Sequence, residues 1–406
     1  MSAERARILF VDHTASLGGG EIALFNLVRH LDHGRYTPIV LLCSDGPLHG
    51  KLTSAGIETH VLPLAANVVN TRKDTLGAGV FLRAGAVLAT LAYIRRLTKF
   101  IKAHEIDLVH TNSLKADVIG GVAARLARRK LIWHVRDRID GDYLPPKVAK
   151  VFRWLSRMLP HYVIANSAST LLTLRHKGPI NGAAVPSGID LSTRIDVVHD
   201  GLAQRWAHLM ADQLPDRHPV IGLVGRISPW KGQHVFINAA AEVRGRFHNV
   251  RFQIIGAALF AERDYEARVR DLVVSLGLQD CVEFTGFCDN VPERMAALDV
   301  LVHASTLGEP FGQVVIEGMA AGKPVIATNG GGIPEIIRDG DTGLLIPMND
   351  HTAMANAIIY LLENPEAAHR MAERGPAWVR EHFAIERTAE LVQEIYQRVM
   401  HNVVAK

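Results

Sequence analysis

Cysteine is scarce in this chain of 406 residues. It occurs only at Cys43, Cys281 and Cys288, and none of these pairs has the CxxC spacing of a zinc site. Three thiols cannot build the disulfide framework of a small secreted domain, so a reducing compartment is expected. The sequence thus excludes disulfide scaffolds and zinc fingers and favours a cytoplasmic protein.

Long apolar runs are lacking too. A helix that spans a bilayer needs about 20 mostly apolar residues, and the longest charge-free stretch of note, Met158–Leu174, is interrupted by proline and polar residues. The start of the chain shows no apolar signal segment, because the short run Ile8–Val11 is followed at once by Asp12 and His13. We expect no membrane-spanning segment.

Aromatic residues make up only 6%, and no recognition module for nucleic acid is visible, so we expect no nucleic-acid partner. The net charge of +4 hides an uneven distribution. Residues 1–203 hold 26 Lys and Arg against 16 Asp and Glu, whereas the remainder holds 19 against 25. This asymmetry indicates two domains with different partners. The basic half could meet an anionic membrane or an acidic acceptor, or it could be an ordinary solvated surface.

Short apolar runs alternate with amphipathic ones along the chain. The short runs predict buried strands at Ile8–Val11, Thr37–Leu42, Glu58–Leu62, Leu108–His110, Leu131–Val135, Tyr162–Ala165, Val220–Val224, Val250–Ile255, Val282–Phe284, Val300–His303 and Pro324–Ala327. The amphipathic runs predict helices at Glu21–Leu31, Arg83–Lys102, Ala116–Leu126, Lys147–Met158, Ala168–His176, Gln233–Val243, Ala261–Leu276, Phe311–Ala321, Thr352–Glu363, Pro365–Arg374 and Ile385–Met400. This alternation is typical of the α/β class, with parallel sheets covered by helices on both faces.

Weak periodicity with Pro215 and Pro219 predicts a boundary between two such sheets. We expect an N-terminal Rossmann-like domain at residues 1–200, a linker at 201–218, and a C-terminal domain at 219–384. A final helix at 385–406 is expected to pack back on the N-terminal domain. Ligands of open parallel sheets bind beyond the carboxyl ends of the strands, so the loops after strands are the candidate sites.

Two of these loops precede helices. The loop after the first strand contains Gly19 and Gly20, which let the backbone approach a ligand beside a helix N-terminus, although the loop could be only a tight connection. The loop after Val220–Val224 carries Arg226 and Lys231, five residues apart. A planar fork and a point charge suit a pyrophosphate, although both could be ordinary surface cations.

A third loop places two glutamates on either side of a helix start. Glu309 lies in the loop, and Glu317 lies in an apolar part of the helix, where a carboxylate needs a donor such as a ribose or sugar hydroxyl. Glu317 could instead reach solvent from the helix edge. The backbone N–H groups of Phe311, Gly312 and Gln313 head this helix and would form a seat for an anion.

The strand-Gly-Arg-x-x-x-x-Lys-Gly loop, followed ~80 residues later by Glu-Pro-Phe-Gly-x-x-x-x-Glu, resembles the family 4 retaining glycosyltransferases of GT-B fold. The turn Asn329–Glu335 and the segment Asp341–Leu345 fit the same family. Looser matches occur in the first half, at the loop Leu17–Glu21, Asp107–Asn112, Ile132–His134 and Val163–Ser167. The resemblance covers essentially the whole chain and implies two Rossmann-like domains that face each other across a cleft.

The resemblance implies transfer of a sugar from a nucleotide-diphosphate donor of the UDP or GDP type to an acceptor hydroxyl. The anomeric configuration would be retained, and the product would be a glycan, a glycolipid or a glycosylated metabolite. The acceptor stays unassigned. A GT-B epimerase acting on a nucleotide sugar and a non-catalytic nucleotide-sugar-binding protein remain open as alternatives.

The resemblance also implies roles for single residues of the second domain. Arg226 and Lys231 would neutralise the diphosphate, and Glu317 would hold the ribose hydroxyls. Glu309 would face the transferred sugar. The backbone amides of Phe311 and Gly312, with Gln313 beside them, would touch the sugar or the phosphate.

In the first domain, Gly19 and Gly20 would close over the phosphate. His134 would point at the donor sugar, unless it is an ordinary core histidine. We therefore take His134, Glu309, Arg226 and Lys231 as the candidate catalytic residues.

Some features depart from the family. Pro186-Ser187-Gly188 has Ser where the usual turn has Asn, and Asp140–Asp142 and Asp339–Asp341 mimic the metal-binding DxD motif of the other large glycosyltransferase fold. Asp-Gly is a strong turn dipeptide, so we predict turns there, no metal site and no cofactor. Fixed cations and helix dipoles would neutralise the leaving group instead.

One helical pattern could serve the membrane. Leu82–Lys102 combines apolar residues with five Lys and Arg, as do helices that lie on anionic bilayers. Such a helix would hold the protein at the inner face of a membrane. The alternative, which we favour slightly, is that its apolar side packs on the sheet.

Overall fold

The computed structural model describes residues 5–64, 84–141, 143–175, 180–191, 218–259 and 262–401. The chain divides into two units. The first comprises Met1–Gly188 and Ile385–Lys406, and the second comprises Ile189–Ala384. The expected domain limit at residue 200 and the expected linker, apart from His218, lie outside the described residues.

The first unit contains a parallel sheet with the strand order β3-β2-β1-β4-β5-β6-β7. Its strands are β1 (Ala6–Asp12), β2 (Tyr36–Leu42), β3 (Glu58–Val61), β4 (Leu108–Thr111), β5 (Lys130–Val135), β6 (Tyr162–Ala165) and β7 (Gly182–Ala184). Its helices are α1 (Gly19–His30), α2 (Pro47–Ser54), α4 (Ala84–Ala103), α5 (Leu114–Leu126), α6 (Pro146–Met158), α7 (Ala168–Arg175) and α15 (Ile385–Met400).

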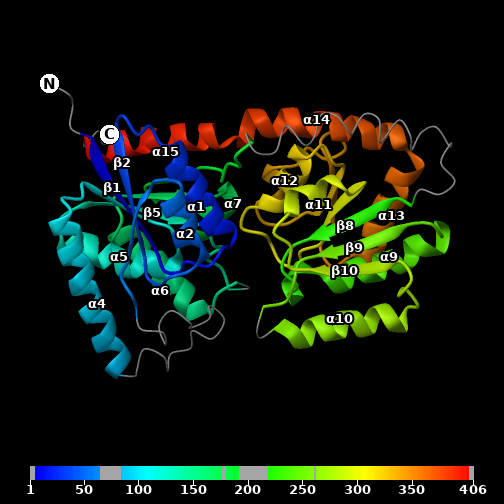
Figure 1. The fold of residues 1–406 in the computed structure, drawn as a ribbon, viewed down its shortest axis with the longest axis horizontal. Coiled ribbons are helices and arrows are strands. Elements are labelled where there is room, and N and C mark those ends of the chain that lie inside the picture. Colours follow the sequence, from blue (N-terminus) through cyan, green and yellow to red (C-terminus); the bar gives the residue numbers. More distant parts are fainter. Residues whose placement is uncertain are drawn as a thin grey trace. The chain divides into compact units, whose positions relative to one another are not determined.

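Alternate residues of β1 point to opposite faces of this sheet, as the pleat requires. Ile8 and Phe10 pack in a core with α1, α2 and α15. Leu9 and Val11 pack in a second core with α4, α5 and α6. Figure 1 shows the helices on these two sides of the sheet. Both faces are buried, which explains why the strands read as continuous apolar runs.

The second unit repeats the plan with the strand order β10-β9-β8-β11-β12-β13, again parallel. Its strands are β8 (Val220–Val224), β9 (Arg251–Ile255), β10 (Val282–Gly286), β11 (Val300–His303), β12 (Val325–Thr328) and β13 (Leu344–Ile346). Its α-helices are α9 (Gln233–Arg246), α10 (Arg263–Ser275), α11 (Val291–Ala296), α12 (Gln313–Ala320), α13 (His351–Glu363) and α14 (Pro365–Phe383). Short 3-10 turns lie at Pro229–Lys231 and Ile333–Glu335.

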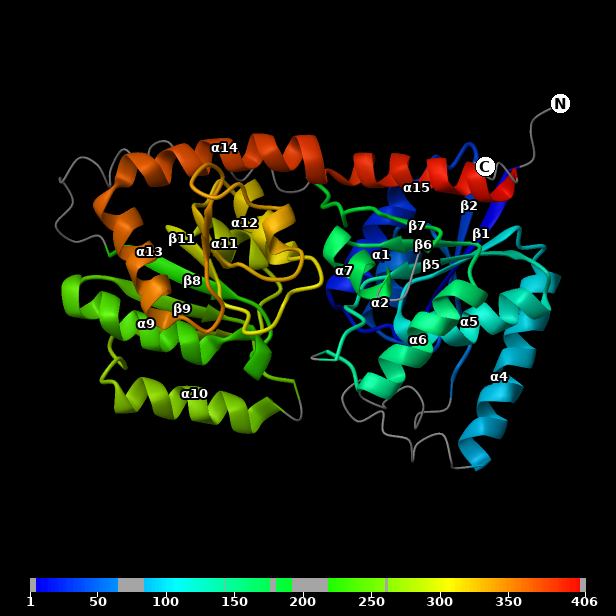
Figure 2. The same ribbon diagram turned by 180° about the vertical axis from the view of Figure 1, so that it is seen from behind.

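The second sheet is also covered on both sides. Ile221 and Leu223 of β8 pack in one core with α9, α10 and α13. Leu301 of β11 and Val325 of β12 pack in the other with α11, α12 and α14. Figure 2 shows α9 and α10 on one side of the sheet and α11, α12 and α14 on the other.

Most predicted elements are confirmed to within a few residues. Four helix starts were wrong by two residues: α1 begins at Gly19 rather than Glu21, α5 at Leu114 rather than Ala116, α10 at Arg263 rather than Ala261, and α12 at Gln313 rather than Phe311. The predicted end of α14 at Arg374 was also wrong, because the helix continues to Phe383. For α12 the difference arises because Gly312 is the N-cap of the helix with a φ of +117°. The elements that the sequence did not predict are short or rich in small residues: α2, α11, β7 and β13.

In each sheet the strand order reverses beside the first strand of the unit, between β1 and β4 and between β8 and β11. The connections there leave in opposite directions, so the loops at the carboxyl ends part and make room for a ligand. Within the described segments, no helix has both the length and the apolarity of a membrane span.

Candidate active site

The switch point of the second sheet carries a close ion pair. The Nζ atom of Lys231 lies 3.0 Å from each carboxylate oxygen of Glu309. Lys231 comes from the loop after β8, and Glu309 comes from the loop between β11 and α12. Both side chains are largely buried, at 17% and 12% exposure. The two sequence motifs therefore meet, although 78 residues separate them.

Glu309 has further donors around it. The Ser305 hydroxyl donates to its Oε2 atom at 2.8 Å, and His303 Nε2 lies 3.3 Å from the same oxygen. Burial alone would raise the pKa of Glu309, but the Lys231 ammonium and the contact with His303 outweigh it and hold the pKa well below its usual range. Glu309 is thus a fixed carboxylate at neutral pH.

The backbone around Glu309 is held by the glycine-rich turn after β12. Gly331 pairs with Glu309 in an isolated bridge, and the Gly332 N–H donates to the Glu309 carbonyl at 2.8 Å. A Cβ at Gly331 would lie 1.9 Å from that carbonyl oxygen, so a side chain is excluded there. Gly312 is restricted by its φ of +117°, which residues with a side chain rarely adopt, and a Cβ there would also lie 2.3 Å from Ile333 Cδ1. These glycines bring the start of α12 against Glu309, while Phe311 is buried beneath it.

The other two charged candidates of this unit are Arg226 and Glu317. Arg226 Nε is 3.3 Å from Glu262 Oε2, and its side chain is 41% exposed. Glu317 is partly buried in α12 and accepts a long hydrogen bond of 3.4 Å from Gln313 Nε2, one turn earlier. Arg226 therefore keeps exposed donor surface in the same loop that carries Lys231.

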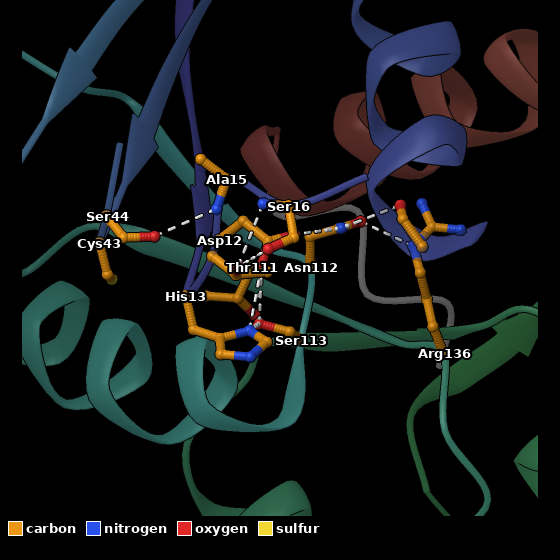
Figure 3. Close-up of polar contacts among 12 residues, drawn as sticks. Asp12, His13, Ala15, Ser16, Cys43, Ser44, Thr111, Asn112, Ser113 and Arg136 are labelled. Atoms are coloured by element: carbon orange, nitrogen blue, oxygen red, sulfur yellow. Dashed lines mark hydrogen bonds and ion pairs between the residues drawn. The ribbon is translucent and has the colours of Figure 1, made fainter. Parts of the chain in front are cut away.

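The switch point of the first sheet carries a polar cluster that sequence reasoning missed (Figure 3). Asp12, at the end of β1, is fully buried. It accepts hydrogen bonds from Asn112 Nδ2 at 2.6 Å and from Ser113 Oγ at 3.1 Å. His13 Nδ1 lies 3.2 Å from Asp12 and 2.8 Å from Ser113. Burial alone would raise the pKa of Asp12, but these contacts outweigh it and lower the pKa.

Arg136, which follows β5, joins this cluster. It donates to Asn112 Oδ1 at 2.7 Å and to Ser187 Oγ at 2.8 Å. Burial lowers its pKa to about 10, against the attraction of Asp12 and Glu21 among other carboxylates, so it stays charged. Burial and the nearby Asp12 charge raise the pKa of Glu21 to about 7. The cluster thus combines a permanent cation with a carboxyl group that titrates near neutrality.

The predicted residues of the first unit lie at this cluster. The carbonyl of Gly20 accepts from Asn112 Nδ2 at 3.2 Å, and Gly19 opens α1. A Cβ at Gly20 would lie 3.4 Å from Arg136. His134 is fully buried at the end of β5, with its Nδ1 atom 3.4 Å from Arg136 Nη2. The structure brings Gly19, Gly20 and His134 into the neighbourhood of one another.

A sequence signal for the missed residues did exist. Asp12 and His13 end or follow β1, Asn112 and Ser113 follow β4, and Arg136 follows β5. The rule that ligands bind beyond the carboxyl ends of strands points to all five positions. The glycine motif indicates only its own loop and carries no information on these polar side chains.

The two Asp-Gly-Asp segments carry no metal-site geometry among the described residues, which exclude Asp142. Asp140 is paired with Arg138. Asp339 and Asp341 form the predicted turn, in which Asp339 accepts from the Leu345 N–H at 2.9 Å and Asp341 pairs with Arg374.

In the described part of the chain, Glu58, His60 and His104 have donor atoms within 4.8 Å of one another, close enough to share a metal ion. Glu58 begins β3 and His104 follows α4. The group therefore lies toward the edge of the sheet where strands begin, away from the polar cluster.

Comparisons with known proteins identify the family of this chain. The family described as "Glycosyltransferase Family 4" matches residues 17–193, and "Glycosyl transferases group 1" matches residues 205–378. The chain is 30% identical over 321 residues to EpsD of Bacillus subtilis, which is named as a glycosyltransferase, and the match covers 76% of this chain and 81% of EpsD. The chain belongs to the family 4 glycosyltransferases.

A further relative and a solved structure agree with this assignment. The chain is 28% identical over 333 residues to the D-inositol 3-phosphate glycosyltransferase of Salinispora tropica, covering 77% of this chain and 68% of that one. The crystal structure of Anabaena HepE in complex with UDP and glucose superposes with a TM-score of 0.81 and 27% identity, covering 97% of this chain and 100% of HepE. The chain therefore has the GT-B fold and is a glycosyltransferase of the retaining type that uses a nucleotide-sugar donor.

Proposed function

We propose that this glycosyltransferase uses a UDP-sugar donor. The observation that carries the proposal is the Lys231–Glu309 pair at the start of α12, beside the Arg226 loop. Cations and a helix N-terminus at a sheet switch point suit a diphosphate. The likeness to HepE, whose crystal structures hold UDP and UDP-glucose, supports uracil as the base.

In this proposal Arg226, Lys231 and the N–H groups near Phe311 and Gly312 neutralise the diphosphate as it leaves. Glu317 holds the ribose hydroxyls, and Gln313, which donates to it, keeps the carboxylate in place.

Glu309 faces the transferred sugar but is not a nucleophile. Lys231, Ser305 and His303 already occupy its oxygens, and its depressed pKa marks a weak base. The acceptor hydroxyl therefore attacks from the leaving-group side, and its proton passes to the departing phosphate. This route retains the anomeric configuration without a metal ion.

The first unit supplies the remaining groups. Gly19 and Gly20 close over the phosphate, and His134 contacts the donor sugar. Arg136, charged and anchored by Asn112 and Ser187, orients the loop after β5. His13, which is 23% exposed and held by the buried Asp12, offers a hydrogen bond to an acceptor hydroxyl.

We also propose that the first unit attaches to an anionic membrane that carries the acceptor. Tyr93, Ile94, Leu97 and Ile101 of α4 are buried in the core, so this part of the helix packs on the sheet. Its first turns instead expose three apolar residues, Val87, Leu88 and Leu91. The first half of α4 thus offers apolar side chains to a membrane, while the second half packs on the sheet and exposes the cations Arg95, Lys99 and Lys102.

Helix α6 packs in the same core as α4, on the same side of the sheet, and also exposes apolar residues. Its apolar residues Val151, Trp154 and Met158 are exposed at 55%, 59% and 58%, at the spacing of one helix face. Lys147 and Lys150 beside them are exposed. An aromatic apolar stripe flanked by lysines suits the headgroup region of an anionic bilayer.

Two experiments test the donor and the stereochemistry. Calorimetric titration with UDP, GDP and ADP should rank UDP first, and Arg226→Ala should weaken it by ~1.5–3 kcal/mol, the range for hydrogen bonds to charged groups. With UDP-glucose and no acceptor, proton NMR should show slow release of α-glucose before mutarotation. Release of β-glucose, or equal affinity for all three nucleotides, would contradict the proposal.

A further inference from the structure

A buried chain of hydrogen-bonding rings runs from the last helix to the end of β5. The hydroxyl of Tyr396, on α15, lies 2.7 Å from His110 Nδ1. His110 Nε2 lies 3.1 Å from His134 Nδ1. All three side chains are fully buried, although Tyr396 and His110 are 286 residues apart in sequence. Helix α15 thus reaches the candidate active site through His110.

Arg136 sets the direction of these hydrogen bonds. Its Nη2 atom lies 3.4 Å from His134 Nδ1, and a guanidinium can only donate. His134 Nδ1 must therefore accept, so in the neutral ring the proton is on Nε2. His110 Nε2 then donates to His134, His110 Nδ1 accepts, and the Tyr396 hydroxyl donates.

Both imidazoles are neutral, which this assignment requires. Burial, together with the Arg136 charge, lowers the pKa of His110 to about 3 and that of His134 well below its ordinary value. Neither ring takes up a second proton near neutral pH. Each ring therefore has one donor nitrogen and one acceptor nitrogen.

The far end of the chain is a donor that is not used. Within the described residues, His134 Nε2 is buried and has no hydrogen-bond partner. A buried N–H without an acceptor destabilises the fold, so such a group calls for a ligand or another explanation. The donor lies at the carboxyl end of the sheet, where ligands of this fold bind.

We propose that Tyr396, acting through His110 and together with Arg136, fixes His134 with its proton on Nε2, so that His134 donates a hydrogen bond to an oxygen of the transferred sugar. Tyr396 and His110 are then positioning residues. The inference rests on the proposed contact between His134 and the donor sugar. It also means that His134 does not take the proton of the acceptor hydroxyl, because Nε2 has no free lone pair.

Nitrogen-15 NMR of the histidine rings in the full chain tests the tautomers without any ligand. His110→Asn and His134→Asn assign the two spin systems by the signals they remove. In wild type, both Nε2 atoms should show the shift of a protonated ring nitrogen. Tyr396→Phe, which removes only the hydroxyl, should populate the other tautomer of His110 to a measurable extent.

Tyr36→Phe is the matched control. Tyr36 is buried and packs edge-on against Tyr396, with ring centroids 5.5 Å apart, but it lies outside the hydrogen-bonded chain. Its variant should leave both tautomers as in wild type. An unprotonated Nε2 on His134, or identical His110 spectra in Tyr396→Phe and wild type, would overturn the proposal.

A titration separates this inference from the proposed function. With UDP and UDP-glucose as probes, Tyr396→Phe should keep its UDP affinity and weaken UDP-glucose by ~2–10-fold, the equivalent of one neutral hydrogen bond. Tyr36→Phe should change neither. If His134→Asn binds UDP-glucose like wild type, the sugar contact itself is wrong. If only His134→Asn weakens it and Tyr396→Phe does not, the sugar contact stands and the positioning role fails.

Discussion

Lys231 and Glu309 form a bidentate ion pair, with Nζ 3.0 Å from both carboxylate oxygens. The pair joins the loop after β8 to the loop before α12. In this arrangement the Lys231 charge is held by Glu309, and a donor diphosphate would share it. The pair therefore preorganises Lys231, so that the conformational entropy of this long side chain is not lost when the diphosphate binds.

The first prediction concerns the stability of this pair. Lys231→Ala leaves a largely buried carboxylate without its cation, so the free energy of unfolding in urea at pH 7 should fall by ~1.5–3 kcal/mol. Adding Glu309→Gln should restore part of the loss, as in a double-mutant cycle.

The control pair is Arg387 and Glu390 on α15, where the two side chains are 53% and 61% exposed. Arg387→Ala should cost ~0.5 kcal/mol or less, as exposed pairs do. Equal losses at the two sites, or a double variant with additive losses, would mean that Lys231 and Glu309 are not coupled.

The second prediction concerns pH. The folded pKa of Glu21 is about 7, above its ordinary value of 4.5, so the native state holds this proton more tightly than the unfolded chain. The stabilisation is present below pH 4.5 and is lost as the pH rises toward 7. Glu21→Gln keeps the neutral form. It should match wild type at pH 4.5 and be more stable by ~1–3 kcal/mol at pH 8.

Urea unfolding of both proteins at the two pH values measures this difference. A gap of the same size at pH 4.5 and pH 8 would show that Glu21 does not titrate between them. If Glu21→Gln is less stable than wild type at pH 8, ionised Glu21 stabilises the fold and the prediction is wrong.

Periodicity predicted the architecture because both sheets are covered on both faces. Runs such as Ile8–Val11 and Val300–Val302 are short and apolar throughout, as expected of parallel strands that are covered on both faces. Helix α2 escaped because Pro47 and Gly50 break the apolar pattern, and β7 escaped because Gly182–Ala184 has no large side chain.

Pairings across the fold could not be predicted in the same way. Glu309 was expected to face the sugar, and nothing in its motif indicates that Lys231 would hold it. The link between Tyr396 and His110 depends on where α15 packs, which local sequence does not encode. Local motifs thus identify functional loops, whereas tertiary packing decides which side chains of those loops meet.

The third prediction concerns the membrane. The protein should sediment with vesicles of anionic phospholipid at low salt and less so at high salt. Arg95, Lys99 and Lys102 are exposed cations of α4, and each contributes ~1 kcal/mol near a charged surface. Arg96 is left intact, because it donates to the Pro63 carbonyl at 2.9 Å.

The triple change to Gln and, separately, Trp154→Ser should each reduce sedimentation while the UDP affinity stays the same. If wild type does not sediment with anionic vesicles at low salt, the first unit does not attach to an anionic membrane and this proposal fails.

The fourth prediction concerns metal ions. Arg226, Lys231 and the start of α12 supply the charge that a metal ion would otherwise provide, so EDTA should leave initial rates unchanged. A loss of activity that Mg²⁺ or Mn²⁺ restores would show that a metal ion takes part. His60→Ala serves as a control, because it disrupts the group formed by Glu58, His60 and His104. The initial rates of this variant with and without EDTA should equal those of wild type.

The most direct test compares two glutamates by calorimetry and turnover. Glu317 is proposed to hold the ribose, so Glu317→Gln should weaken UDP and UDP-glucose alike. Glu309 is proposed to face the sugar, so Glu309→Gln should bind UDP at least as well as wild type but lose turnover, since a contact made chiefly in the transition state appears in kcat. The opposite pattern, with Glu309 governing UDP affinity and Glu317 governing turnover alone, would contradict the placement of the donor in this site.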